Sequence, residues 1–204
     1  MKKAKVVCLL GIDGSGKTTI IRKLEEYYKD KGLKCKSIYF GWMPFLPLTK
    51  FISFLFKKKD YRIVKELNKK KVSKRKISFL KGIFLLYYYV EYLFRYFFKI
   101  MIKSFFFDVF LVDRYFYDVY AHYDLGKSKL FRVLVKIFPK PHYIFLLDVD
   151  VKTAKRRKKE IDIKEVSKHR RRYEELGKIL KFDRIDTNKK ISGSLEEIIK
   201  KIKV

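Results

Sequence analysis

The feature that most constrains this chain is a glycine-rich segment near its amino end, Gly11-Ile-Asp-Gly-Ser-Gly-Lys-Thr18. It follows an apolar run, Lys5–Leu10, and it precedes Lys17–Lys31, where apolar residues recur at helical spacing. A strand that turns into a helix through glycines points successive backbone N–H groups at one spot, beside the positive end of the helix. The segment fits the pattern G-x-x-x-x-G-K-[ST] and predicts a loop that holds the phosphates of a nucleotide.

The side chains of this segment have separate predicted roles. The ammonium of Lys17 is placed to reach the β- and γ-phosphates, and the hydroxyl of Thr18 to ligate Mg²⁺. Because an acid among phosphates is unfavourable, Asp13 is expected to bond a sugar hydroxyl of the acceptor; a turn-stabilising aspartate is the alternative. The residues expected to contact ATP are Gly11, Asp13, Gly14, Ser15, Gly16, Lys17, Thr18 and Thr19, with Arg156 from a later basic segment.

Apolar runs without alternation recur along the chain, which is typical of parallel strands buried on both faces. The segments between them have helical spacing, and a further helix is expected over 194–203. This alternation predicts an α/β protein: one domain of three layers (α/β/α), with a five-stranded, mostly parallel sheet and a small helical lid over about 151–172. The predicted strands are Lys5–Leu10, Cys35–Phe40, Phe107–Val112, Tyr143–Leu147 and, more weakly, Lys181–Ile185.

Positive charge dominates the composition. The chain of 204 residues has 51 Lys and Arg against 22 Asp and Glu, a formal net charge of +29. Such an excess favours polyanionic partners: nucleotides, nucleic acid or an anionic membrane. A heat-adapted source or an AT-rich genome could give the same composition, and no nucleic-acid-binding pattern accompanies it. Small-molecule nucleotides are therefore the expected partners.

Neither the cysteines nor the apolar segments indicate secretion or membrane insertion. Cys8 and Cys35 are too few for a disulfide scaffold or a zinc site. The amino end has neither the apolar length nor the small-residue cleavage site of a secretory signal, and no stretch approaches the roughly 18–20 apolar residues of a membrane helix. A cytoplasmic protein is the expectation.

Residues 78–106 form an unusually apolar helical segment. A helix of this kind is expected to be buried on most sides, as a core helix that also forms a homodimer interface. Contact with a membrane surface is the alternative, here and for the apolar stretch 42–56, where a flap over the substrate pocket is favoured. The charged residues that interrupt the helix, at i, i+4 spacing, are Glu91, Arg95, Lys99 and Lys103.

The chain contains two basic runs, 57–76 and 152–172, and we interpret them differently. The first is expected to be a solvated helix face. The second overlaps the expected lid, where mobile arginines could neutralise a phosphoryl group during transfer. Arg157 is the favoured catalytic cation, with Arg156 or Lys158 as alternatives.

Other classes of phosphate-loop protein agree poorly with this sequence. A switch GTPase needs the string Asn-Lys-x-Asp, and the nearest string, at Asn188, lacks the acid. The chain is also short for a motor or a helicase. Kinases of small molecules remain.

Within that class, the segments Asp13–Thr19 and Asp113-Arg114-Tyr115 resemble those of thymidylate kinases. Later segments around Leu147-Asp148 and Arg172–Leu176 are similar to the lid region of that family and the helix after it, so the resemblance spans most of the chain outside about 41–105. It implies a three-layer P-loop kinase that uses ATP and Mg²⁺.

The resemblance also implies roles at the acceptor side. Asp113, at a strand end beside the loop, is expected to hold Mg²⁺ with Thr18; a helix cap is the alternative. Arg114 is expected to grip the acceptor phosphate in a bidentate fork. The acceptor-binding residues are then Asp13, Arg95, Arg114, Tyr115 and Asp118, and the catalytic residues Lys17, Arg114 and Arg157.

Several positions depart from the family pattern. Segment 41–44 lacks the arginine of the family, Glu91 stands at the expected helix arginine with Arg95 one turn later, and Asp118 replaces a serine. The expected function is a nucleoside monophosphate kinase, with dTMP the first acceptor to consider. The alternatives are a kinase of another small phosphate or hydroxyl acceptor, and a non-catalytic nucleotide-binding protein on RNA or an anionic membrane.

Overall fold

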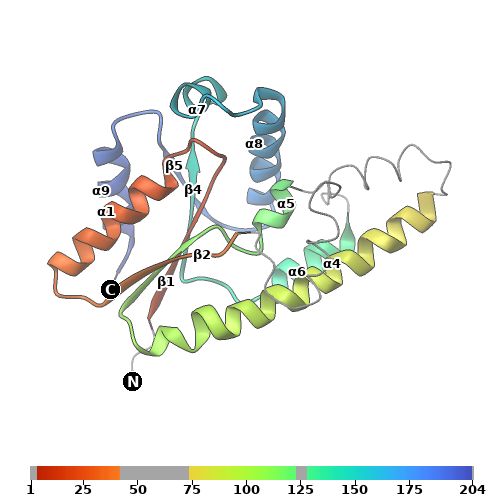
Figure 1. Cartoon of the computed structure of the whole chain (residues 1–204), viewed down its shortest axis with the longest axis horizontal. Coiled ribbons are helices and arrows are strands. Elements are labelled where there is room, and N and C mark those ends of the chain that lie inside the picture. Colours follow the sequence, from red (N-terminus) through yellow and green to blue (C-terminus); the bar gives the residue numbers. More distant parts are fainter. Residues whose placement is uncertain (1–3, 42–73, 123–127, 204) are drawn as a thin grey trace.

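The computed structural model describes residues 4–41, 74–122 and 128–203, which form a parallel sheet covered by helices on both faces (Figure 1). The five strands lie in the order β2-β3-β1-β4-β5, and every neighbouring pair is parallel. The sheet thus confirms the three-layer α/β fold. The strands are β1 (Lys5–Leu10), β2 (Cys35–Tyr39), β3 (Val109–Asp113), β4 (Tyr143–Asp148) and β5 (Asp183–Asp186).

Two cores lie on opposite faces of the sheet because successive strand residues point to opposite sides. Val7 and Leu9 of β1 pack in the core that contains α1 (Lys17–Asp30) and α9 (Ile191–Lys201). Val6 and Cys8 pack in the larger core, under four helices. These helices are α4 (Lys74–Tyr96), α5 (Asp118–His122), α6 (Lys129–Ile137) and α8 (Ile163–Gly177).

The expected lid is helical, although its boundaries differ from the prediction. It comprises α7 (Val151–Arg157), a short link and α8, which continues five residues beyond the predicted end at 172. Asp150 and Asp162 cap these two helices by accepting hydrogen bonds from backbone N–H groups of the first turn. The link between the helices lies above the glycine-rich loop at the carboxyl edge of the sheet (Figure 1), and Lys158, at the end of α7, donates to Asp13 of the loop.

The apolar segment 78–106 contains three elements rather than one helix. α4 ends at Tyr96 and continues as a π-helical turn (Phe97–Met101) and a 3₁₀ turn (Lys103–Phe105). Of the four charged residues in this segment, Glu91 and Arg95 are buried, Lys99 is half-buried and Lys103 is exposed, while the exposed side chains described between 82 and 98 are apolar. Among the described residues no helix is both long and apolar enough to cross a bilayer.

Two predictions fall outside the described residues. The expected flap at 42–56 lies there, as does the larger part of the basic run 57–76.

Candidate functional site

The glycine-rich loop joins β1 to α1 at the carboxyl edge of the sheet. Gly16 precedes α1 with φ +88°, and no side chain caps the first turn of the helix. Gly14 has φ +82°, and a Cβ there would lie 2.7 Å from the carbonyl oxygen of Ala154 in α7. Only glycine fits this position, because the backbone is left-handed and α7 packs directly against it. The uncapped helix end leaves N–H groups directed at the site that phosphates would occupy.

Lys17 is folded back into the loop. Its Nζ donates to the carbonyl oxygens of Gly11 at 2.9 Å and Ile12 at 2.8 Å, and to Ser15 Oγ at 3.3 Å. The side chain is buried, so the ammonium is held by loop carbonyls instead of by water. Burial, with repulsion from Arg114, lowers the pKa of Lys17 to about 8. A bound triphosphate would replace these weak partners with anionic oxygens.

This pKa predicts a pH dependence of ATP binding. The ammonium is the form that attracts phosphates, so affinity is expected to fall as pH rises through about 8. Binding should be roughly tenfold weaker at pH 9 than at pH 7, measured by titration calorimetry. A Lys17→Arg variant keeps its charge across this range and should show no such decline. An equal decline in that variant would contradict the assignment to Lys17.

Asp113 lies at the carboxyl end of β3, next to β1, with its Cα paired in register with Leu9. Its Oδ1 is buried and has no hydrogen-bond partner among the described residues. Burial raises the pKa of this carboxyl, and the nearby Asp118 and Asp13 add to the effect. An orphaned buried carboxylate oxygen needs a partner, and Mg²⁺ prefers such ligands. With the exposed Thr18 at the start of α1, Asp113 fits a Mg²⁺ ion bound together with nucleotide phosphates.

Arg114 links the loop to the acceptor side. Its Nη2 donates to Asp13 Oδ1 at 2.5 Å, and its Nη1 donates to both carboxylate oxygens of Asp118, at 2.9 and 3.0 Å. Burial acts to lower the pKa of Arg114, but Asp118, Tyr173 and Asp13 outweigh it and raise the pKa. The residue has φ +66°, a left-handed conformation that is unfavourable for arginine. The surrounding ion pairs hold it there.

Asp118 is itself held from two sides. The hydroxyl of Tyr173, which is buried in α8, donates to Asp118 Oδ1. The carboxylate side chain is only 4% exposed, so Arg114 is its charge partner in a dry environment. α5 and α8 are thereby joined through Asp118.

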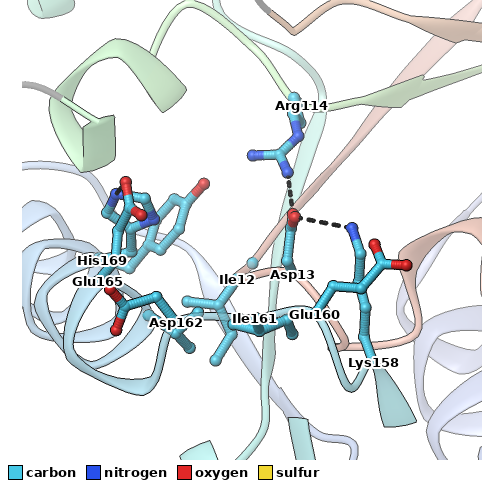
Figure 2. A pocket seen from close by; sticks show the side chains of 12 residues that line it. Ile12, Asp13, Arg114, Lys158, Glu160, Ile161, Asp162, Glu165 and His169 are labelled. Atoms are coloured by element: carbon cyan, nitrogen blue, oxygen red, sulfur yellow. Dashed lines mark hydrogen bonds and ion pairs between the residues drawn. The ribbon is translucent and has the colours of Figure 1, made fainter. Parts of the chain in front are cut away.

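Asp13 forms an ion pair on each side. Besides Arg114, it accepts from Lys158 Nζ at 3.1 Å (Figure 2). Burial alone would raise the pKa of Asp13, but these two cations lower it. Asp13 is 44% exposed and faces a cavity of about 300 Å³. The side chains of Ile161, Glu165, Val166, His169 and Tyr173 line the same cavity from the lid.

The lid arginines occupy different positions. Arg157 donates to the carbonyl oxygens of Thr187, at 2.7 Å, and Gly14, at 3.4 Å, so it bridges the loop and the segment after β5. Arg156 is exposed and no contact joins it to the loop within the described part of the chain. The structure therefore brings Arg157 to the loop but not Arg156.

Arg95 lies on the inner face of α4. Its guanidinium is completely buried, 4.8 Å from the ring centroids of both Phe40 and Tyr92. Nη2 donates to the carbonyl oxygen of Gly41 at 2.7 Å, while Nε and Nη1 have no hydrogen-bond partner among the described residues. Gly41 also adjoins Arg114, since a Cβ there would lie 2.7 Å from the Cδ of that arginine. A buried guanidinium with two unsatisfied nitrogens beside the site fits an anion.

The structure does not bring Tyr115 to the site. Its ring is completely buried among aromatic side chains, and its hydroxyl donates to the carbonyl oxygen of Pro139 at 2.7 Å. The residue after Arg114 points into the core because the left-handed turn at Arg114 redirects the chain. Sequence reasoning gave no role to Tyr173 or His169, although Tyr173 stands in the string that resembled the helix after the lid.

The parallel sheet, with a glycine-rich loop between β1 and α1, defines a three-layer α/β fold. A solved structure, thymidylate kinase from Ehrlichia chaffeensis, superposes over 98% of both chains with a TM-score of 0.60 and 19% sequence identity. The chain therefore has a thymidylate kinase-like fold. No family model matches the sequence, and no curated protein matches it.

Proposed function

We propose that the protein is an ATP- and Mg²⁺-dependent phosphotransferase that transfers the γ-phosphoryl group to a nucleoside monophosphate, with dTMP the first acceptor to test. The observation that carries the proposal is the convergence of Lys17, Asp113 and Arg114 where adjacent strands β1 and β3 end. A strand-end carboxylate beside a phosphate loop is the arrangement that such chemistry requires.

The residues of the site would have separate roles in phosphoryl transfer. Mg²⁺, held by Asp113 and Thr18, would neutralise phosphate charge during transfer. Lys17 would leave the loop carbonyls and bind the phosphates, while Arg157, already against Gly14, would stabilise the moving group. No general base is needed when the acceptor is an ionised phosphate.

Two arginines are available to an acceptor phosphate. Both terminal nitrogens of Arg114 already donate to carboxylates, Nη1 to Asp118 and Nη2 to Asp13. Arg114 would therefore bind an acceptor phosphate only if one of these ion pairs were broken. Arg95 has two buried nitrogens without partners among the described residues, so it would anchor the phosphate without breaking an existing ion pair. We therefore assign the phosphate anchor to Arg95, with Arg114 as a second contact that its ion pairs to Asp118 and Asp13 restrain.

The same ion pairs favour a second candidate, a kinase of a hydroxyl acceptor. Asp118 neutralises Arg114, the residue expected to grip a phosphate. Asp13 is half-exposed at the cavity and could receive the proton of an attacking hydroxyl. This candidate predicts activity with acceptors that lack a phosphate.

One panel of acceptors separates the candidates. ADP release would be measured with nucleoside monophosphates, dTMP among them, and with nucleosides and small polyols. We expect turnover with a monophosphate; turnover only with hydroxyl acceptors would support the second candidate. ATP binding without turnover on any of these acceptors would contradict the proposed activity.

The Asp118→Asn variant sharpens this test. Removing the carboxylate charge makes Arg114 available, so the KM for a monophosphate acceptor should fall by about tenfold, the value of one charge-assisted contact. Asp183→Asn is a matched control, because Asp183 pairs with the exposed Lys201 away from the site. A KM raised by Asp118→Asn would contradict the view that this ion pair withholds Arg114 from the acceptor.

A further inference from the structure

The two faces of helix α7 have different surroundings. Ala154 faces the glycine-rich loop, because a Cβ at Gly14 would lie 2.7 Å from its carbonyl oxygen. Arg157 and Lys158, three and four residues further along, lie on the same side and donate hydrogen bonds to residues of the loop. The inner face of α7 is therefore already occupied by contacts with the loop.

The outer face of α7 is basic. Lys152 and Arg156 stand two residues before and two residues after Ala154, and at 3.6 residues per turn this spacing places them on the opposite side of the helix. Both side chains are exposed, and neither forms an ion pair with a described residue. This position explains why Arg156, expected to contact ATP, does not reach the loop. Its charge can act on a nucleotide only through space.

The segment after β5 extends the same surface. The side-chain oxygen of Asn188 accepts from the backbone N–H of Asp150 at 2.9 Å, at the start of α7. The carbonyl oxygen of Thr187 accepts from Arg157 at 2.7 Å, at the end of α7. The segment therefore packs along the helix and continues directly into two exposed lysines. We define the lid face by four exposed cations: Lys152, Arg156, Lys189 and Lys190.

Positive charge is denser around the lid face than along the chain as a whole. Residues 150–160 and 186–190 contain eight cations and three acids, a net charge of +5 in 16 residues. The whole chain, at +29 over 204 residues, has about half that density. Asp150 and Asp186 accept hydrogen bonds from backbone N–H groups of their own turns and pair with none of the lid-face cations among the described residues. The lid face therefore keeps a positive potential.

The surroundings of these cations distinguish between possible anionic partners. No large hydrophobic side chain is exposed in residues 150–160 or 186–190. Insertion into an anionic bilayer and stacking of nucleic-acid bases both need such side chains, whereas a free polyphosphate needs charge alone. A helix with its side chains is about 10–12 Å across, and the Debye length is about 8–10 Å at 0.1–0.15 M salt. Charges on the lid face therefore act on an anion that approaches the loop.

We infer that the lid face guides nucleotide polyphosphates to the loop: its cations accelerate the arrival of ATP without touching the bound nucleotide. A surface of one sign beside a binding site raises association rates about 10–10³-fold. The loop itself attracts ATP weakly from a distance, because Lys17 is buried and bonded to loop carbonyls. The inference rests on the proposed use of ATP.

The test measures association and dissociation of a fluorescent ATP analogue with Mg²⁺ by stopped flow. In the lid-face variant all four cations are replaced by glutamine. At low ionic strength its association rate constant should be about five- to tenfold below that of the wild type, with the dissociation rate constant within about twofold. At about 1 M salt the Debye length is about 3 Å, so the two association rates should converge.

A matched control removes the same charge from the opposite edge of the sheet. β1 has six residues and spans about 20 Å, so cations at the amino ends of the strands lie about two Debye lengths from the loop. The C-terminus lies at this edge, away from α7 (Figure 1). This variant should associate within about twofold of the wild type. Its four glutamines replace exposed lysines: Lys34, Lys36, Lys200 and Lys203.

Thermal denaturation verifies that both variants fold. If the lid-face variant is unfolded, the pair Lys152→Gln and Arg156→Gln replaces it and should slow association about two- to threefold. Equal slowing by the lid-face and control variants overturns the inference, because net charge and not its position would then be responsible. An unchanged association rate in the lid-face variant overturns it too, as does faster dissociation alone, which indicates direct contact. A wild-type chain that binds no ATP analogue contradicts the proposed function itself, before any variant is compared.

Discussion

Replacement of Lys17 by alanine is expected to reduce ATP consumption at least 10²–10³-fold, the loss found when a preorganised charge is removed from a transition state. Lys17 is the buried cation of the loop, bonded to the carbonyl oxygens of Gly11 and Ile12. The variant removes the ammonium without altering the glycines that shape the loop. ADP release at saturating acceptor measures the effect.

A control substitution on the same helix distinguishes the loss of the loop ammonium from the loss of any positive charge. Lys23 of α1 is exposed, and Lys23→Ala should retain activity within twofold. Undiminished ATP consumption by Lys17→Ala would refute the assignment of the segment to phosphate binding, and with it the proposed function.

Arg114→Met is expected to lower the free energy of unfolding by about 3–5 kcal/mol, because it leaves a buried carboxylate without its charge partner. The Arg114 side chain is 12% exposed and that of Asp118 4%, so water cannot replace the lost partner. Asp13 is more exposed and keeps Lys158, so it contributes less. Urea denaturation monitored by fluorescence measures the change.

Two further variants test the cause of this loss. Adding Asp118→Asn to Arg114→Met removes the unpaired charge and should restore more than half of the lost stability. Arg184→Met breaks an ion pair to Asp148 in which the arginine is 52% exposed, and it should cost about 1 kcal/mol or less. Equal losses for Arg114→Met and Arg184→Met would contradict a special role for the buried pair.

Local pattern predicted β1, β3 and β4 well because each is a short apolar run, whereas β2 and β5 are more polar and the start of β5 was displaced by two residues. β1 was predicted at its observed limits, whereas β3 was displaced by two residues at its start. Phe107 was assigned to that strand because it is apolar, but it packs against the core before the strand begins. The apolar pattern therefore predicts which residues are buried more accurately than it predicts where a strand begins and ends.

α4 shows what periodicity could not decide. The i, i+4 spacing of Glu91 and Arg95 placed them correctly on one face, but it gave no indication of which face turned inward. Apolar patterning normally settles the choice, and here both faces are apolar enough to be buried. The sheet, Phe40 and Gly41 settled it, by offering Arg95 two rings and a carbonyl oxygen.

By itself, the sequence determined the glycine-rich loop between a strand and a helix and the α/β class, since both depend on residues that are neighbours along the chain. Only the tertiary structure decided the connections of Arg114, which joins Asp13, 101 residues away, to Asp118 and through it to Tyr173, a further 55 residues along. Strand order brings these side chains together, and their mutual charge and burial set the ion pairs. Such pairings have no local signature, because their free energy depends on distances in space rather than along the chain.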